Sequence, residues 1–256
     1  MAGHVVSGLV HTILVTQEAL RGERVAIVGQ AFHHSFRVAR LAPGEPVRVV
    51  DGQGGARWGW VERVDRTAGW IRLREWAPSL EDPWTVELAF AVPRAERASW
   101  LVEKATELGV ARFVLLETAR SVSGRASNQI RERLTRVAQA ALLQCGRARL
   151  PEVAGPVSLS HWLDRGEEGR AQILVFDQGG PPFFDFTPAE GSRFRVAVGP
   201  EGGWSDPERE EFARRGLSFW SLGLRPLRIE TAAIAAVVQL ISRISTARFD
   251  SSKGGA

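Results

Sequence analysis

The feature that most constrains the fold lies in the last quarter of the chain, where an apolar run twice leads into a glycine-bearing loop and then a helical pattern. The first loop, residues 199–204, follows the run 194–198, and the second, 223–228, follows 219–222. Glycines let a ligand approach the backbone, and free amides at a helix start donate hydrogen bonds. In open α/β sheets, ligands bind at the carboxyl ends of the strands. The pattern therefore predicts an α/β sheet with a ligand site at these loops.

Further strand and helix patterns alternate before these loops. Residues 84–91, 113–116 and 173–176 are short apolar runs of the kind that buried parallel strands show. Helical patterns are expected at 94–108, ended by Gly109, around 130–142, after Ser205-Asp206-Pro207-Glu208, and at 231–246. The helix at 231–246 is apolar around most of its circumference, so it is expected to be buried in the core or against a second subunit.

The first 78 residues have a different texture. The runs 46–50, 58–64 and 70–74 alternate in polarity between glycine-rich turns, which predicts a small β-barrel or sandwich. Residues 51–55, Asp-Gly-Gln-Gly-Gly, invite comparison with the nucleotide loop of a Rossmann-type methyltransferase. That site needs a helix to follow, whereas the next segment alternates like a strand, so a hairpin turn is favoured.

A polar, proline-bearing joint at 77–83 marks the expected domain boundary. We predict a barrel over 1–78, an α/β domain over 79–250, and a disordered tail over 251–256. The single cysteine, Cys145, excludes intramolecular disulfides and a Cys-based zinc site. A signal peptide, a membrane-spanning stretch and a metal site are not expected, and the cytoplasm is the expected location.

The basic residues are almost all arginine and are unevenly distributed. Of 33 Lys and Arg residues, 31 are Arg, and the net charge is +3 over 1–79, +6 over 94–150 and −2 over 151–256. Arginine binds phosphate bidentately and stacks on bases, which suits a nucleic-acid partner. Genome composition or thermal adaptation also enriches arginine, so charge alone leaves both readings open.

The two loops resemble a known pair of motifs. Gly-Pro-Glu-Gly-Gly at 199–203 and Leu-Gly-x-Arg-x-Leu-Arg-x-Glu-Thr-Ala at 222–232 are similar to the cofactor loops of the RsmE family of ribosomal RNA methyltransferases, in the knotted SPOUT superfamily. Pro226 and Ile229 depart from the family pattern, which usually has an aliphatic residue and a Thr there. Further matching segments lie at 33–40, 103–110, 120–122 and 144–147.

The resemblance implies S-adenosylmethionine (SAM)-dependent methylation of uridine N3 in the 16S RNA of the small ribosomal subunit. It also implies a deep trefoil knot in the C-terminal domain, a PUA-like N-terminal barrel and a homodimer. The implied cofactor contacts are Val198, Gly199, Glu201, Gly202, Leu222, Gly223, Leu227, Ile229 and Thr231. The implied RNA contacts are His33, Arg37, Arg40, Arg120 and Arg147.

Catalytic roles follow from the chemistry of the implied reaction. Uridine N3 carries a proton, so the imide anion must be formed or stabilised. Arg228 is expected to stabilise that anion, and Glu230 to orient Arg228 or accept the proton. Helix capping and a salt bridge are the structural alternatives for this pair. The alternative function is a non-catalytic RNA-binding or ribosome-assembly protein.

Overall fold

The computed structural model describes residues 10–121, 126–165, 171–188 and 193–253, with side chains up to 246. Val122 and the end of the predicted tail, 254–256, lie outside these residues. The chain forms two compact units, one of Met1–Glu81 with Gln139–Leu150 and one of Asp82–Ala138 with Pro151–Ala256. The division expected at residue 78 therefore differs from the structure, which assigns Gln139–Leu150 to the N-terminal unit.

The N-terminal unit contains a five-stranded sheet in the order β1-β3-β4-β5-β2. Strand β1 pairs parallel with β3, and the other neighbours are antiparallel. The strands are β1 (Thr12–Leu14), β2 (Arg24–Val28), β3 (Pro46–Val50), β4 (Ala56–Val64) and β5 (Ala68–Trp76). Two short helices, α1 (Gln17–Arg21) and α2 (Gly29–Phe32), and a π-helical segment, η1 (His33–Val38), complete the unit.

The glycine-rich segment after β3 connects two antiparallel strands, as the hairpin prediction required. Asp51 Oδ1 accepts hydrogen bonds from the amides of Gln53 and Gly55, and β4 follows directly. No helix starts at this loop, so the Rossmann-type alternative lacks the amides that would hold a cofactor.

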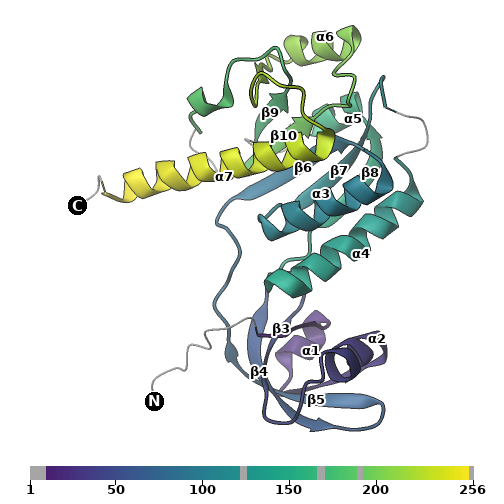
Figure 1. The fold of residues 1–256 in the computed structure, drawn as a ribbon. Coiled ribbons are helices and arrows are strands. Elements are labelled where there is room, and N and C mark those ends of the chain that lie inside the picture. The colour runs from purple at the N-terminus through teal and green to yellow at the C-terminus, as the bar shows by residue number, and fades with distance from the viewer. Residues whose placement is uncertain (1–9, 122–125, 166–170, 189–192, 254–256) are drawn as a thin grey trace. The chain divides into compact units, whose positions relative to one another are not determined.

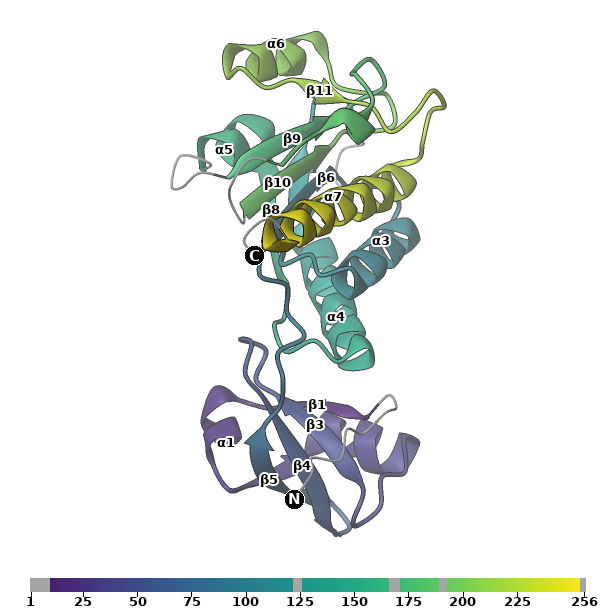
Figure 2. The same cartoon turned by 90° about the vertical axis from the view of Figure 1, so that its left-hand side faces the viewer.

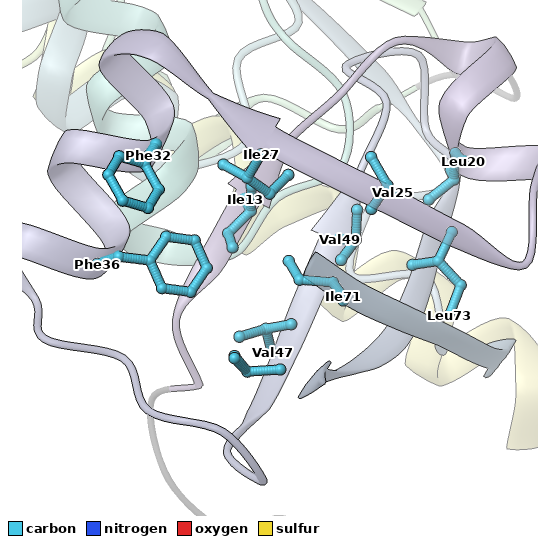
Figure 3. Close-up of a cluster of buried hydrophobic side chains, with 11 residues drawn as sticks. Ile13, Leu20, Val25, Ile27, Phe32, Phe36, Val47, Val49, Ile71 and Leu73 are labelled. Atoms are coloured by element: carbon cyan, nitrogen blue, oxygen red, sulfur yellow. The ribbon is translucent and has the colours of Figure 1, made fainter. Parts of the chain in front are cut away.

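Alternate residues of the strands point into one apolar core, shown in Figure 3. Val47, Val49 and Ile71 are fully buried there. Phe32 and Phe36 enter the same core from α2 and η1. Gly69 makes room for Phe36, because a Cβ at Gly69 would lie 2.2 Å from the ring. The helical segments are therefore fastened to the inner side of the sheet by these two phenylalanines.

Residues 139–150 join the N-terminal unit through a second apolar cluster and a buried ion pair. Leu142 and Ala148 pack with Val50 of β3. Arg147 Nη2 donates to Glu81 Oε2 at 2.8 Å, and Glu81 Oε1 accepts from two further amides. Sequence periodicity carries no signal for such a pairing of distant segments.

The C-terminal unit is built on a parallel six-stranded sheet in the order β11-β9-β10-β6-β7-β8. The predicted α/β fold class is confirmed. The strands are β6 (Thr85–Ala91), β7 (Arg112–Glu117), β8 (Glu152–Ser158), β9 (Gln172–Phe176), β10 (Arg193–Val198) and β11 (Phe219–Trp220). The sequence analysis missed β8, whose run is broken by Gly155 and Pro156.

Helices cover both faces of this sheet, as Figures 1 and 2 show. Helices α3 and α7 pack against each other, and α7 also contacts β6 and β10. Trp162 of α5 and Phe212 of α6 belong to the cluster on the opposite face. The helices are α3 (Ala95–Glu107), α4 (Asn128–Cys145), α5 (Leu159–Asp164), α6 (Asp206–Arg214) and α7 (Ile229–Lys253), with a 3₁₀ turn, η3, at Phe183–Asp185.

Helix α7 differs from the prediction in two ways. It continues to Lys253, so the tail predicted to begin at residue 251 is wrong for its first three residues. Its segment Ile229–Thr246 is also long and apolar enough to cross a membrane by length and composition. Ala233, Val237 and Leu240 are fully buried in the core, however, and a core helix meets the same criterion.

Candidate cofactor pocket

A pocket of about 460 Å³ lies beyond the carboxyl ends of β9, β10 and β11. Both predicted loops line it. Eight of the nine predicted cofactor residues are in its wall, namely Val198, Gly199, Glu201, Gly202, Leu222, Gly223, Leu227 and Ile229. Thr231 is exposed on the first turn of α7 and is not in the wall, whereas its neighbour Ala232 is.

The loop after β10 is shaped by Trp204. The indole Nε1 donates to the carbonyl oxygen of Phe176 at 3.1 Å, which ties this loop to the end of β9. A Cβ at Gly199 would lie 2.8 Å from the indole, so a larger residue would displace either the loop or the ring. Helix α6 starts at the segment Ser205-Asp206-Pro207-Glu208, as predicted, and Glu208 Oε2 accepts from both the amide and the hydroxyl of Ser205.

The loop after β11 supplies the apolar part of the wall. Leu222, Leu227 and Ile229 line the pocket, and Ile229 is buried. Ser221 Oγ accepts from the amide of Gly223 and donates to its carbonyl oxygen, and Gly223 has φ of +132°. A side chain at Gly223 would strain this backbone. Ile229, at the position where the family pattern usually has a Thr, therefore extends the apolar surface of the pocket in place of a hydroxyl group.

A third loop, after β9, also lines the pocket and was not predicted. It contributes Asp177, Gln178 and Gly179, next to Phe176 at the end of β9. Asp177 is ion-paired with Arg209 of α6, and its amide donates to the carbonyl oxygen of Trp220. Residues 179 and 180 are both glycine after the apolar run 173–176, which is the pattern that identified the other two loops. The same reasoning applied there would have found this loop.

Arg97 of α3 links the two predicted loops. Its Nη1 lies 3.4 Å from Glu201 Oε1, and its Nε lies 3.5 Å from Glu230 Oε1. The Glu230 side chain is 10% exposed, and its Oε2 has no hydrogen-bond partner among the described residues. Arg97 therefore partly neutralises one carboxylate in the pocket wall and one buried behind it. Nothing in the sequence pattern of α3 singled out Arg97.

The predicted catalytic pair is not brought together as expected. Glu230 is paired with Arg97, and neither Glu230 nor Arg228 lines the pocket. Arg228 is exposed on the same loop as Arg225, which does line the pocket. Glu230 was expected to orient Arg228. Its buried carboxylate instead pairs with Arg97 and so holds the start of α7.

The predicted RNA contacts have different environments. Arg120 Nη1 donates to the carbonyl oxygen of Gly202 at 2.7 Å, so this arginine braces the pocket loop. Arg147 is buried against Glu81, which contradicts its predicted role as an RNA contact. His33, Arg37 and Arg40 are exposed along or after η1. Arg37 also donates to the carbonyl oxygen of Arg66 and lies over the Phe32 ring.

Comparisons with known proteins identify the family. The RNA methyltransferase domain model matches residues 80–241. A Mycobacterium bovis protein named ribosomal RNA small subunit methyltransferase E is 32% identical, over 89% of each chain. The chain belongs to the RsmE family of RNA methyltransferases.

Solved structures of two methyltransferases have the same fold. A Legionella pneumophila protein in complex with the bound cofactor SAM is 28% identical, with a TM-score of 0.79 over 91% of this chain and 98% of that one. The RsmE protein of Neisseria gonorrhoeae, bound to S-adenosyl methionine, has a TM-score of 0.83 over 91% and 97% of the two chains at 22% identity. The pocket therefore occurs in a fold shared with two structures that contain SAM.

Proposed function

We propose that this protein transfers a methyl group from SAM to N3 of a uridine in 16S ribosomal RNA. Membership of the RNA methyltransferase family sets the reaction class and SAM as the cofactor. The observation that carries the proposal is the pocket at the carboxyl ends of the parallel strands, with eight of the nine predicted cofactor residues in its wall. Uridine N3 as the target atom rests on the resemblance of those motifs.

The residues present fit SAM. A pocket of about 460 Å³ is in the size range of small-molecule sites. Glycine backbone at 199, 202 and 223 allows close approach, and Leu222, Leu227 and Ile229 offer an apolar wall for a flat base. The wall also contains the carboxylates of Asp177 and Glu201, paired with Arg209 and Arg97, which can face a cationic sulfonium ligand.

The chain's own residues have three tasks. SAM supplies, when bound, a methyl group already activated on sulfur. The loops must align the acceptor base with it and exclude water, which Trp204 and Arg120 support by fixing the loop after β10. The imide anion of the base needs a cation, and Arg225 and Arg228 project from the loop after β11. We assign anion stabilisation to Arg228, assisted by Arg225, and loop positioning to Glu230.

Further parts of the proposal concern the whole protein. Strand β11 lies at the edge of the sheet, and the chain then returns to α7, which packs on β6 and β10. This path is compatible with a trefoil knot formed by the two pocket loops. The curled N-terminal sheet is proposed to be a PUA-like RNA-binding barrel. The protein is proposed to act as a homodimer in the cytoplasm on ribosomal RNA or the small subunit.

The decisive test is the nucleoside content of ribosomal RNA. Small-subunit RNA from a deletion strain, digested and analysed by mass spectrometry, is expected to lack one 3-methyluridine that the parent strain contains. Re-expression of the wild-type chain should restore it. An unchanged profile would refute uridine N3 methylation, and a non-catalytic assembly role would then be the better reading.

The location of the cofactor site has its own prediction. Replacing Gly202 and Gly223 with Val is expected to abolish binding of S-adenosylhomocysteine in calorimetry, because Val side chains would enter the wall and strain Gly223. Gly52→Val is the matched control, since it also has positive φ but lies in the β3–β4 hairpin. Loss of affinity in the control alone would place the cofactor at that hairpin instead.

A further inference from the structure

The outer face of the N-terminal sheet combines tryptophan and arginine in a way that the proposed cofactor site does not use. Along β4, Gly59 and Val61 are buried on the core side, so Trp60 between them points outward. Along β5, Ile71 is buried, and its neighbours Trp70 and Arg72 point outward in the same way. These outward side chains are half-buried, so part of each indole remains accessible.

Each of these indoles has an arginine beside it. Trp60 lies directly opposite Arg72 in the β4–β5 pairing. Trp70 lies opposite Arg63, whose guanidinium carbon is 5.2 Å from the centroid of the indole ring. Trp60 and Trp70 are thus diagonal neighbours across a pairing that shifts register between Val61 and Arg63, and aromatic side chains at diagonal positions lie within reach of one extended ligand. Arg24 of β2 pairs with Arg72 and extends the basic surface.

The charge of this face is positive after its ion pairs are counted. Arg24, Arg63, Arg72 and Arg74 face outward, and the neighbouring carboxylates are Glu62 and Asp65. Glu62 alone serves both Arg24 and Arg72, at 2.9 and 2.6 Å. The hydrogen bond from Arg72, together with Arg24, lowers the pKa of Glu62 and keeps it ionised. Two arginines sharing one carboxylate leave positive charge beside Trp60.

Accessible indoles beside guanidinium groups on a sheet are suited to one kind of ligand. Every base has a π-face that can stack on an indole, and the phosphates between bases pair with arginine. A purely apolar partner would gain nothing from the arginines, and a duplex keeps its bases stacked on each other. A single strand satisfies both features, because its bases are free to stack while its phosphates stay exposed.

We propose that Trp60 and Trp70, with Arg24, Arg63 and Arg72, form a platform that binds single-stranded RNA by base stacking. The proposal rests on the proposed function, because it makes RNA the ligand. The platform lies on the opposite side of the sheet from η1, which packs into the core through Phe36. It is therefore distinct from the surface of His33, Arg37 and Arg40.

The test is RNA binding by the full chain, measured by fluorescence anisotropy with a labelled ten-nucleotide uridine strand and a ten-base-pair RNA duplex. Trp60→Leu and Trp70→Leu are each expected to weaken single-strand binding about tenfold, because leucine lacks a π-face. Trp60→Phe and Trp70→Phe should keep most of the affinity. Trp100→Leu, which changes a tryptophan on α3 that is 45% exposed, is the matched control and should bind normally.

Salt dependence separates the two parts of the platform. Arg72→Gln should lower the slope of log affinity against log salt by about one, because one phosphate contact and its counterion are lost. Trp60→Leu should reduce affinity without changing that slope. Thermal unfolding of each variant shows whether it is folded. If a leucine variant is unfolded, the affinity of the corresponding phenylalanine variant is compared with that of the wild type instead.

Three outcomes would overturn the platform. Equal RNA affinity in the leucine and phenylalanine variants would show that base stacking does not cause the binding. Loss of binding only in an Arg37→Gln, Arg40→Gln double variant would place the RNA on the η1 side. Failure of the wild-type chain to prefer the single strand over the duplex would also refute it. In each case the 3-methyluridine measurement still decides the proposed function independently.

Discussion

At the scale of single residues, local motifs located the pocket but not the contacts that support it. Gly199, Gly202 and Gly223 were identified because each loop follows an apolar strand and leads into a helix start, where an open backbone and free amides suit a ligand. Arg147 looked like a surface arginine, yet it is buried against Glu81, which lies 66 residues earlier in the chain. Ion pairs between distant segments leave no local pattern, so the partners of Glu230 and Arg147 could not be predicted from sequence.

The pairing of Arg97 with two carboxylates yields a residue-scale prediction. Arg97→Met should weaken binding of S-adenosylhomocysteine about fivefold, roughly 1 kcal/mol, because Glu230 loses its only ion-pair partner among the described residues. The value is modest because Arg97 is 33% exposed and solvent screens the pair. Arg97→Lys should restore much of the affinity, since it retains the charge. Calorimetry measures both.

A neighbouring arginine provides the control for this effect. Arg133 of α4 donates to Ser99 of α3 and is not among the residues that line the pocket. Arg133→Met should therefore bind S-adenosylhomocysteine like the wild type. If Arg97→Met also retains full affinity, or if Arg133→Met loses as much, Arg97 does not position the loops. A Glu230→Gln variant in the Arg97→Met background should add little, since both act through one contact.

At the scale of secondary-structure elements, prediction succeeded where the hydrophobic pattern was continuous. Strands β6, β7, β9 and β10 and helix α7 were found because their buried faces give long apolar runs. The short elements β1, α1 and β2 were missed, because three to five residues carry too little periodicity. The π-helical segment η1 has no distinct sequence signature, and its Phe36 packs against Gly69 of β5, a contact between distant segments that leaves no local pattern.

The pairing of Glu81 with Arg147 gives a prediction for the N-terminal unit. Burial opposes ionisation of Glu81, but hydrogen bonds from Arg147 and two amides outweigh it and lower the pKa of that carboxyl. Its stabilising contribution is therefore complete at neutral pH and is lost as pH falls through the lowered pKa. Glu81→Gln should reduce the unfolding free energy of this unit by about 3 kcal/mol at pH 7, because Arg147 stays buried.

Hydrogen exchange at the amides of β3 and β4 would measure this loss within the unit. The difference between Glu81→Gln and the wild type should shrink at acidic pH, since protonation removes the same charge. Glu62→Gln is the control, because Glu62 pairs with Arg24 and Arg72 at the surface and should matter much less. Equal protection in Glu81→Gln and the wild type at neutral pH would contradict a stabilising pair.

At the scale of the whole molecule, the sequence indicated two units but not how the chain divides between them. Composition changes sharply near the proline-bearing joint, and so a boundary at 78 was the natural expectation. The structure returns Gln139–Leu150 to the N-terminal unit. A discontinuous unit of this kind depends on tertiary packing, such as that of Leu142 on Val50, which has no signal in local composition.

The proposed homodimer leads to the prediction at this scale, and the structure determines where it should be tested. Ala236 and Val237, in the middle of the apolar stretch of α7, are fully buried within the protomer. A charge there would disrupt the core and report nothing about assembly. Among the side chains of α7 that the structure describes, up to residue 246, Val238 is the large apolar one left most open, at 45% exposure, so it is the position at which a partner helix would pack.

Val238→Lys should convert the dimer to a monomer at micromolar concentration, measured by analytical ultracentrifugation, because an isologous interface places two such charges near its axis. The variant should keep its helix content, since the lysine points to solvent in the separated protomer. Binding of S-adenosylhomocysteine should weaken with dissociation, because Ile229 and Ala232 of α7 line the pocket.

Ala213→Lys on the exposed side of α6 should remain a dimer with normal affinity. A monomeric wild type would refute the dimer, and a monomeric variant with full affinity would refute the coupling alone.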